Sequence, residues 1–399
     1  MLKKKVIPIV LAVFMVLSLT ACNGGKETQS GNQEEESIAI GFIGSLTGPY
    51  EVYGKIGRGA AEMAVDHINE QGGILGRKVV LKVYDNQSEA IETTNVARKA
   101  ILQDKVVAFV GPDASAALIA LSPVCEEYGV PSMAYAGSSI NITKFDNGST
   151  RPYNFRVNTA AHQATGVMAQ YSVEKLGLKK FAALYDVTTT AGVDGLKYFE
   201  AGLNEAGGEI VTSEGYKTGD IDFRAQLSAI KNVGGIDAIY VPAQYTELGL
   251  IANQARELGI DTMLIGDRGW MMTDVFDIAK DNLEGSYFNC DIDPTEERFA
   301  DFTKEFEERY GYNPAVAAGN DAYFCYDCFL VIKNAIEKAG VTDPKAISES
   351  IEKNTQELKV LTTNLTINPE THNAYREMTI FKIENQKFIK VEDYRINIG

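Results

Sequence analysis

Short apolar runs rich in β-branched residues alternate with helical patterns along most of this chain, and this alternation limits the folds that it can adopt. The runs predict strands at 38–42, 79–84, 106–110, 131–134, 181–185, 209–216, 238–241 and 263–265. Apolar residues spaced near 3.6 predict helices at 57–71, 89–104, 116–128, 162–176, 193–206, 223–232 and 247–258. A repeated strand and helix order is typical of parallel sheets covered by helices.

The repeating pattern is interrupted between residues 141 and 161, where Asn147-Gly148 and Pro152 stand among few helix formers. The chain after residue 37 is too long for one domain of about 100 to 200 residues. We therefore predict two α/β domains with a crossover at the interruption. Beyond Trp270 the pattern changes to a strand at 285–290, helices at 296–310 and 317–339, and a hairpin of 375–383 with 387–394.

The amino-terminal segment indicates where the protein works. Three lysines at 3–5 precede an uncharged apolar run, 6–21, which is shorter than the roughly 20 residues that span a bilayer. This order is typical of a secretory signal peptide. The polar stretch 23–37 predicts a flexible tether. Leu19-Thr20-Ala21-Cys22 resembles the lipobox of bacterial lipoproteins, which implies lipidation of Cys22; the alternative is an uncleaved anchor with Cys22 as an ordinary residue.

Composition excludes several classes of function. A net charge of −16 with 45% hydrophobic residues fits a folded, soluble body and argues against a nucleic-acid partner. Three histidines and five cysteines leave little material for a metal site, and none is predicted. Cys325 and Cys328 form a CxxC inside a helical pattern, which favours ordinary helix-face cysteines over a redox or metal pair.

Nucleotide and catalytic motifs are also missing. The glycines of 54–59 lack the GxGxxG order, and 48–55 has five residues between its glycines where a phosphate-binding loop has four. The chain contains no Gly-x-Ser-x-Gly elbow. We therefore predict a protein that is not an enzyme and has no cofactor.

Several segments carry a family resemblance that covers 38–399. They are the opening Gly41-Phe42-Ile43-Gly44-Ser45-Leu46-Thr47-Gly48-Pro49, the helix and turn at 57–74, Val110-Gly111-Pro112-Asp113-Ala114-Ser115, and Gly129-Val130-Pro131. On these residues the chain resembles the leucine/isoleucine/valine-binding family of type I periplasmic solute-binding proteins. The resemblance implies two doubly wound parallel-sheet lobes, joined by three crossovers, that close around a solute and deliver it to an ABC importer.

The resemblance also implies a division of the chain. We expect the signal peptide and lipobox at 1–22, the tether at 23–37, an N-terminal lobe of 38–156 with 289–365, and a C-terminal lobe of 157–288 with 366–399.

The site follows partly from the residues themselves. Ser115 stands where a strand, turn and helix unit places an N-cap, and such a helix start attracts anions. By resemblance, Ser115, the main chain at Ala136 and Gly137, and the Ser138 hydroxyl hold a ligand carboxylate; the alternative is that both serines are only caps. The resemblance also places four further side chains at the ligand, with packing as the alternative for the tyrosines: Tyr53, Gln244, Tyr245 and Tyr323.

Two departures from the family bear on the ligand. Residues 188–192 read Thr-Thr-Thr-Ala-Gly where relatives have a tyrosine, so this wall of the cleft should be smaller or more polar. Amino-acid binders carry an acid in a Gly-x-(Asp/Glu)-Gly segment, but this chain has Arg268 there, after Asp267. Either Asp267 replaces the acid that holds the ligand ammonium, or Arg268 clamps a second anionic group of the ligand. The alternative is that Arg268 points to solvent.

Together these observations predict an extracytoplasmic solute-binding lipoprotein, anchored to the cell membrane through Cys22, that works with an ABC-transporter permease. Its solute should be a small carboxylate-bearing molecule, with an amino acid favoured over a dicarboxylate or an aromatic acid. The alternative from another class is a ligand-sensing module that acts with a separate membrane partner.

Overall fold

The computed structural model describes residues 37–317 and 320–394. Residues 37–399 form one compact unit. The predicted signal peptide, Cys22 and the predicted tether up to Glu36 lie outside the described residues. Within the described ranges, no helix is both long and apolar enough to cross a membrane.

The first lobe is built on a five-stranded parallel sheet. Its strands are β1 (Ile38–Gly44), β2 (Val79–Asp85), β3 (Ala108–Val110), β4 (Ser132–Ala134) and β5 (Asn154–Arg156), in the order β2-β1-β3-β4-β5. Helices α1 (Glu51–Glu70), α2 (Ala90–Leu102) and α3 (Ser115–Tyr128) connect them. Strand β5 lies inside the predicted crossover and was not predicted from the sequence, because Phe155 is the sole apolar residue among its three.

The second lobe is built on a seven-stranded sheet of order β14-β13-β10-β9-β8-β6-β7. The parallel strands are β6 (Lys180–Asp186), β7 (Glu209–Tyr216), β8 (Ala238–Tyr240), β9 (Met263–Gly266) and β10 (Tyr287–Cys290). The hairpin of β13 (Met378–Glu384) and β14 (Lys387–Tyr394) adds antiparallel strands. The helices are α4 (Ala161–Glu174), α5 (Thr190–Ala206), α6 (Arg224–Val233), α7 (Tyr245–Glu257) and α8 (Val275–Ala279).

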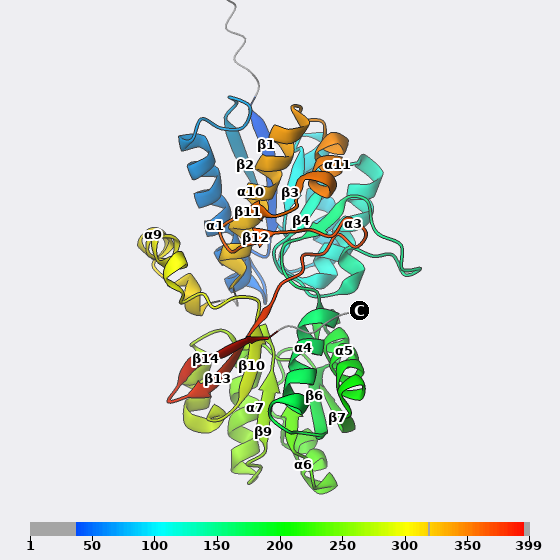
Figure 1. Ribbon diagram of the computed structural model, residues 1–399, viewed down its shortest axis with the longest axis vertical. Coiled ribbons are helices and arrows are strands. Elements are labelled where there is room, and N and C mark those ends of the chain that lie inside the picture. Colours follow the sequence, from blue (N-terminus) through cyan, green and yellow to red (C-terminus); the bar gives the residue numbers. More distant parts are fainter. Residues whose placement is uncertain (1–36, 318–319, 395–399) are drawn as a thin grey trace, which may run out of the picture. The chain divides into compact units, whose positions relative to one another are not determined.

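Between β10 and β13 the chain returns to the first lobe (Figure 1). This part holds α9 (Ala300–Tyr310), α10 (Asp321–Ala339), α11 (Pro344–Asn354) and the short strands β11 (Leu358–Lys359) and β12 (Asn364–Leu365). Helix α10 packs against α1, and its apolar face joins the buried core beneath β1. The chain therefore passes between the lobes after β5, after β10 and after β12, which confirms the predicted fold of two doubly wound lobes joined by three crossovers.

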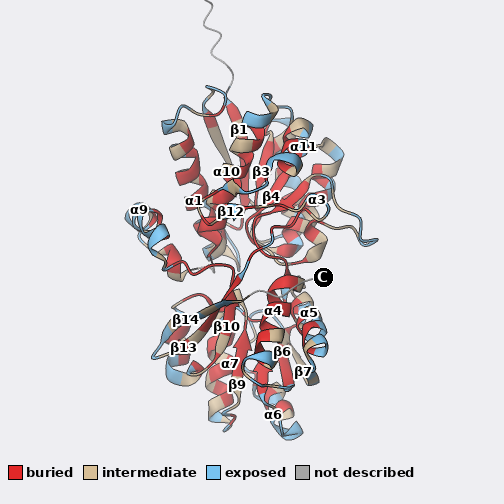
Figure 2. Cartoon of the chain, in the orientation of Figure 1, coloured by how far each residue is buried: buried red, intermediate tan, exposed pale blue. Residues whose placement is uncertain are grey.

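The predicted lobe boundary at 288/289 needs a correction. Asn289 and Cys290 pair with Ile380 and Thr379 in the second sheet, so this boundary falls inside β10. The crossover starts after Cys290, because the ladder with β13 continues to that residue. In each lobe the central strands are buried, whereas the edge strands β7 and β14 and the outer helix faces are partly exposed (Figure 2).

Arg376 ties the crossovers together. Its Nε donates to the Val157 carbonyl in the first crossover at 2.8 Å, and its Nη1 donates to Thr362 Oγ1 at 2.8 Å. Its Nη2 lies 3.7 Å from Asp327 Oδ2 on α10. The side chains of Arg376 and Asp327 are 4% and 0% exposed, so this is a buried charge pair whose disruption is costly. The first and third crossovers thus meet at Arg376, and we call this region the hinge.

Candidate functional site

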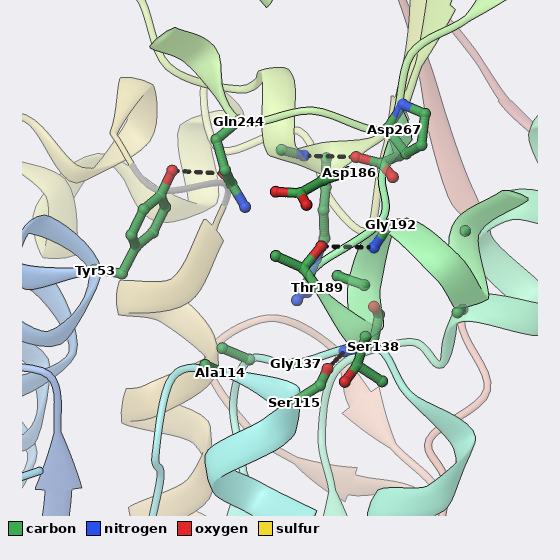
Figure 3. Close-up of a pocket in the computed structure, with 18 of the residues that line it drawn as sticks. Tyr53, Ala114, Ser115, Gly137, Ser138, Asp186, Thr189, Gly192, Gln244 and Asp267 are labelled. Carbon is green, nitrogen blue, oxygen red and sulfur yellow. Dashed lines mark hydrogen bonds between the residues drawn. The ribbon is translucent and has the colours of Figure 1, made fainter. Parts of the chain in front are cut away.

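A cavity of about 260 Å³ lies where loops after the parallel strands of both sheets meet. In doubly wound folds, ligands bind beyond the carboxyl ends of the strands. The volume is near the lower end of the roughly 300 to 1,000 Å³ of drug-sized pockets, which suits a small solute. Figure 3 shows Ser115, Gly137 and Ser138 on one side and Asp186, Gln244 and Asp267 on the other.

Helix α3 presents an uncapped amino terminus to this cavity. Its N-cap residue is Ala114, and no side chain caps the helix. Ser115 is therefore the first helical residue, which corrects its prediction as the N-cap. Its Oγ accepts hydrogen bonds from the main-chain N–H of Ser138 at 3.0 Å and Ser139 at 3.2 Å (Figure 3). The Ser115 O–H proton and the first amides of α3 remain available to an anion.

The loop at 136–138 packs closely against α3 at Gly137. Any other residue at this position would be strained. Gly137 has φ +69°, and a Cβ there would lie 2.6 Å from Leu118 Cδ1. Its carbonyl accepts a hydrogen bond from Asn158 Nδ2 at 2.7 Å. Ala136, Gly137 and Ser138 all line the cavity, so the loop and the helix end form one wall.

The wall formed by the second lobe is polar, as the sequence predicted for residues 188–192. Asp186 accepts hydrogen bonds from the main-chain N–H of Thr188 at 2.7 Å and from the Thr188 hydroxyl at 2.5 Å. Thr189 caps α5, because its Oγ1 accepts from the Gly192 N–H at 3.1 Å (Figure 3). Thr188, Thr189 and Thr190 line the cavity.

The three tyrosines that were predicted to contact the ligand lie at different positions relative to the cavity. Tyr53 lines the cavity, and its hydroxyl donates to Gln244 Oε1 at 2.6 Å, a hydrogen bond between the lobes (Figure 3). Tyr245 starts α7, beside Gln244, and packs against the core of the second lobe, so it does not line the cavity. Tyr323 is 0% exposed, and its hydroxyl contacts Thr303 Oγ1 at 2.8 Å. Its prediction as a ligand contact is therefore wrong, because α10 turns this side chain into the core.

Asp267 and Arg268 both line the cavity. Asp267 Oδ1 accepts from the Gly269 N–H at 3.0 Å, and burial raises the pKa of this carboxyl. Arg268 Nη1 lies 3.5 Å from Oδ2 of Asp291, whose side chain is 0% exposed. Asp291 Oδ1 accepts from the Thr159 N–H at 2.9 Å. Arg268 thus faces a protein carboxylate at the hinge rather than solvent.

Two acids of the first lobe also line the cavity but were not predicted to bind. Asp113 Oδ1 accepts from the Ser45 hydroxyl at 2.9 Å, and burial raises the pKa of Asp113 to about 6. Burial raises the pKa of Asp321 to about 8, although Arg268 opposes the shift. Asp113 stands in a segment that carries the family resemblance. For Asp321 the sequence held no signal, because the predicted helix began at 317 and its phase around the cavity was unknown.

The cysteines take no part in the cavity. Cys125, Cys290, Cys325 and Cys328 are free and buried, as ordinary helix and strand residues are. Cys325 Sγ lies 3.1 Å from the Gly57 carbonyl oxygen, and burial raises the pKa of the Cys125 thiol to about 12. Across 37–317 and 320–394, no group of His, Cys, Asp and Glu side chains has the arrangement of a metal site.

Comparisons with known proteins agree with this geometry. A family model described as periplasmic binding protein matches residues 37–387. The Leu/Ile/Val-binding protein BraC3 of Rhizobium johnstonii is 30% identical over 89% of this chain and 94% of its own length. The crystal structure of the leucine-binding protein LivK from Thermotoga maritima has a TM-score of 0.80 at 28% identity, covering 90% of this chain and 99% of LivK. LivJ from Streptococcus pneumoniae, solved in complex with isoleucine, has a TM-score of 0.78 at 27% identity, covering 89% of this chain and 100% of LivJ.

Proposed function

The chain belongs to the periplasmic binding protein family, and we propose that it captures a small carboxylate-bearing solute, with an amino acid favoured, between its lobes. Its relatives include a Leu/Ile/Val-binding protein and a branched-chain amino acid transporter substrate-binding protein. The proposal includes the residues that make the contacts: Tyr53, Ser115, Ala136, Gly137, Ser138, Gln244 and Asp267. Each of them lines the cavity.

The uncapped start of α3 supports the carboxylate most directly. The Ser115 hydroxyl oxygen already accepts two main-chain N–H groups, and its proton remains free for donation to a ligand in the cavity that Ser115 lines. Together with the first amides of α3 and the Ser138 hydroxyl, it offers several donors to one anion. Each hydrogen bond to a charged group contributes about 1.5 to 3 kcal/mol. Three such bonds supply much of the roughly 8 kcal/mol of a micromolar complex.

The ammonium group of an amino acid fits beside Asp267. Burial raises the pKa of this carboxyl, so a cation beside it is stabilising. Arg268 is already 3.5 Å from Asp291, which balances its charge. This pairing supports Asp267 as the replacement acid and weighs against Arg268 as the clamp of a second anionic group. An amino acid is therefore favoured over a dicarboxylate or an aromatic acid.

Titration calorimetry and thermal unfolding with amino acids, dicarboxylates and aromatic acids test the proposal. We expect saturable binding and a raised melting temperature for at least one amino acid. No stabilised complex with any member of the panel would contradict the proposal. Turnover of the bound solute, followed by mass spectrometry, would contradict our view that the protein is a carrier and not an enzyme.

We also propose the setting in which the protein works. A lipid on Cys22 and a tether of about 15 residues would hold the lobes at a root-mean-square distance of about 20 Å from the membrane. The tether would raise their effective concentration at a permease. The variant Cys22→Ala should release the protein from the cell membrane, and retention of the variant would contradict the anchor. A pull-down of membrane partners with the full-length protein would distinguish the two functions. Recovery of a permease would support transport, and recovery of a different membrane partner would support sensing.

A further inference from the structure

Four polar side chains that line the cavity come from segments beside the hinge: Thr159, Arg268, Asn289 and Asp321. We call them the hinge cluster. They come from the first crossover, the turn after β9, strand β10 and the start of α10. Thr159, Asn289 and Asp321 are 1%, 0% and 6% exposed, and the Arg268 side chain is 19% exposed.

Three members of the cluster have a buried polar atom without a hydrogen-bond partner among the described residues: Thr159, Arg268 and Asn289. Asn289 Nδ2 donates to the Ala164 carbonyl at 2.7 Å, which fixes the amide orientation and leaves Oδ1 unpaired. Thr159 Oγ1 is unpaired as well. Arg268 Nη1 has an ion-pair partner in Asp291 but no hydrogen bond. The Asp321 carboxyl interacts electrostatically with Arg268. Buried polar groups normally find partners, so a partner from the solute is indicated.

The groups of an amino acid that the proposed function already places do not satisfy this cluster. The carboxylate lies at α3 and the ammonium beside Asp267. An ammonium group only donates, so it cannot pair with Arg268 Nη1, which needs an acceptor. Asn289 Oδ1, in contrast, needs a donor. The cluster therefore fits one further group of the solute that both accepts and donates hydrogen bonds.

We infer that the cavity selects an amino acid whose side chain carries a neutral carboxamide-type group, bound by Arg268 through its oxygen and by Asn289 and Asp321 through its N–H. This inference rests on the proposed function and specifies its solute. It also separates the chain from its leucine-binding relatives, because an aliphatic side chain would leave the unpaired atoms of Thr159, Arg268 and Asn289 without a partner.

The charges of the cluster disfavour the other polar side chains. A second carboxylate would accept from Arg268 but would lie near Asp267 and Asp291, and would leave Asn289 Oδ1 without a donor. A cationic side chain would satisfy Asn289 and Asp321 but would face the Arg268 guanidinium without giving it an acceptor. Burial raises the pKa of Asp321 to about 8, so near neutral pH a neutral partner suits it.

Three amino acids with side chains of nearly equal shape test the inference: leucine, asparagine and aspartate. Their dissociation constants are measured by calorimetry on the same preparation, with 2,4-diaminobutyrate as the cationic comparison. A site built to hydrogen-bond its ligand discriminates strongly against an apolar isostere, so we expect asparagine to bind at least about 100-fold more tightly than leucine. If leucine, aspartate or diaminobutyrate binds more tightly than asparagine, the inference is overturned but the proposed function still stands. If none of the four amino acids binds, the inference is overturned, and the wider amino-acid panel then decides whether the proposed function is correct.

The variant Asp321→Ala tests whether the cluster causes the preference. We expect it to reduce the ratio of leucine to asparagine dissociation constants at least about tenfold, since one acceptor for the carboxamide is lost. Asp301→Ala is the control, because it removes an exposed acid from the first turn of α9. Thermal unfolding of both variants shows that they are folded. An unchanged ratio in folded Asp321→Ala contradicts the role of the cluster.

Discussion

Ser115 shows how one side chain can serve both the protein and a ligand. Its hydroxyl oxygen joins α3 to the loop at 138–139, and its proton remains for the solute. The variant Ser115→Ala removes that donor and leaves two main-chain amides unpaired. We expect binding of the solute to weaken about 10 to 100-fold in calorimetry.

Ser122→Ala is the matched control for Ser115→Ala. Ser122 lies on the same helix, and its hydroxyl donates to the Leu118 carbonyl within the lobe. We expect this variant to keep its affinity. If both variants bind as the wild type does, Ser115 has only a structural role and the carboxylate site at α3 is wrong.

Asp321 makes stability depend on pH. Its folded-state pKa of about 8 lies above its ordinary value of 3.8, so from about pH 4 to 8 the folded protein retains a proton that the unfolded chain has lost. The free energy of unfolding should therefore fall as pH rises through this window. Asp113, with a folded-state pKa of about 6, acts in the same direction below that pH.

Denaturation of the solute-free protein at about pH 6 and about pH 9 isolates the contribution of Asp321. We expect the free energy of unfolding of the wild type to fall by about 1 to 3 kcal/mol more than that of Asp321→Asn, which cannot ionise. Asp301→Asn, in the exposed first turn of α9, is the control. Equal losses in the wild type and in Asp321→Asn would contradict the raised pKa.

At the scale of elements, the loop after β4 depends on Gly137. Alanine at this position combines a left-handed φ of +69° with a Cβ 2.6 Å from Leu118 Cδ1. The loop must shift, and Ala136 and Ser138 shift with it. We expect Gly137→Ala to lose stability by more than the roughly 1 to 2 kcal/mol of left-handed strain, and to lose most of its solute binding.

Gly148→Ala controls for the backbone strain alone. Gly148 has φ +82°, but a Cβ there meets nothing within 4 Å. This variant should lose stability by the strain and retain its affinity. Wild-type affinity in Gly137→Ala would show that the loop does not shape the site.

Helices and strands were predictable from the sequence where the apolar pattern was strong. Which side chains of a helix face the cavity or the core was less predictable. The predicted strands from 38 to 265 are all present, since each combines apolar residues with a turn signal. Tyr323 was placed at the ligand by the resemblance, and this placement failed because α10 turns Tyr323 into the core and brings Asp321 to the cavity. Which face of a helix meets a ligand depends on how the helix packs, and the sequence alone did not give that packing.

At the scale of the whole folded unit, the contact between Tyr53 and Gln244 could not be derived from the sequence. These residues are 191 positions apart, and they meet only because the lobes face each other across the cavity. Both were expected at the ligand, but their hydrogen bond to each other depends on how far the lobes close. Lobe closure depends in turn on the hinge around Arg376, where segments from three parts of the chain meet.

The Tyr53 hydroxyl should stabilise the closed arrangement of the lobes. Tyr53→Phe keeps the ring that lines the cavity and removes only the 2.6 Å hydrogen bond to Gln244. A net hydrogen bond contributes about 0.5 to 1.5 kcal/mol, so we expect affinity to fall about 2 to 12-fold. The change should lie in the dissociation rate, because closure follows the encounter with the solute. Tyr128→Phe, which alters an exposed hydroxyl beside Arg98 on the first lobe, should leave both rates unchanged. A slower association with an unchanged dissociation rate in Tyr53→Phe would show that the hydroxyl acts on entry of the solute and not on closure.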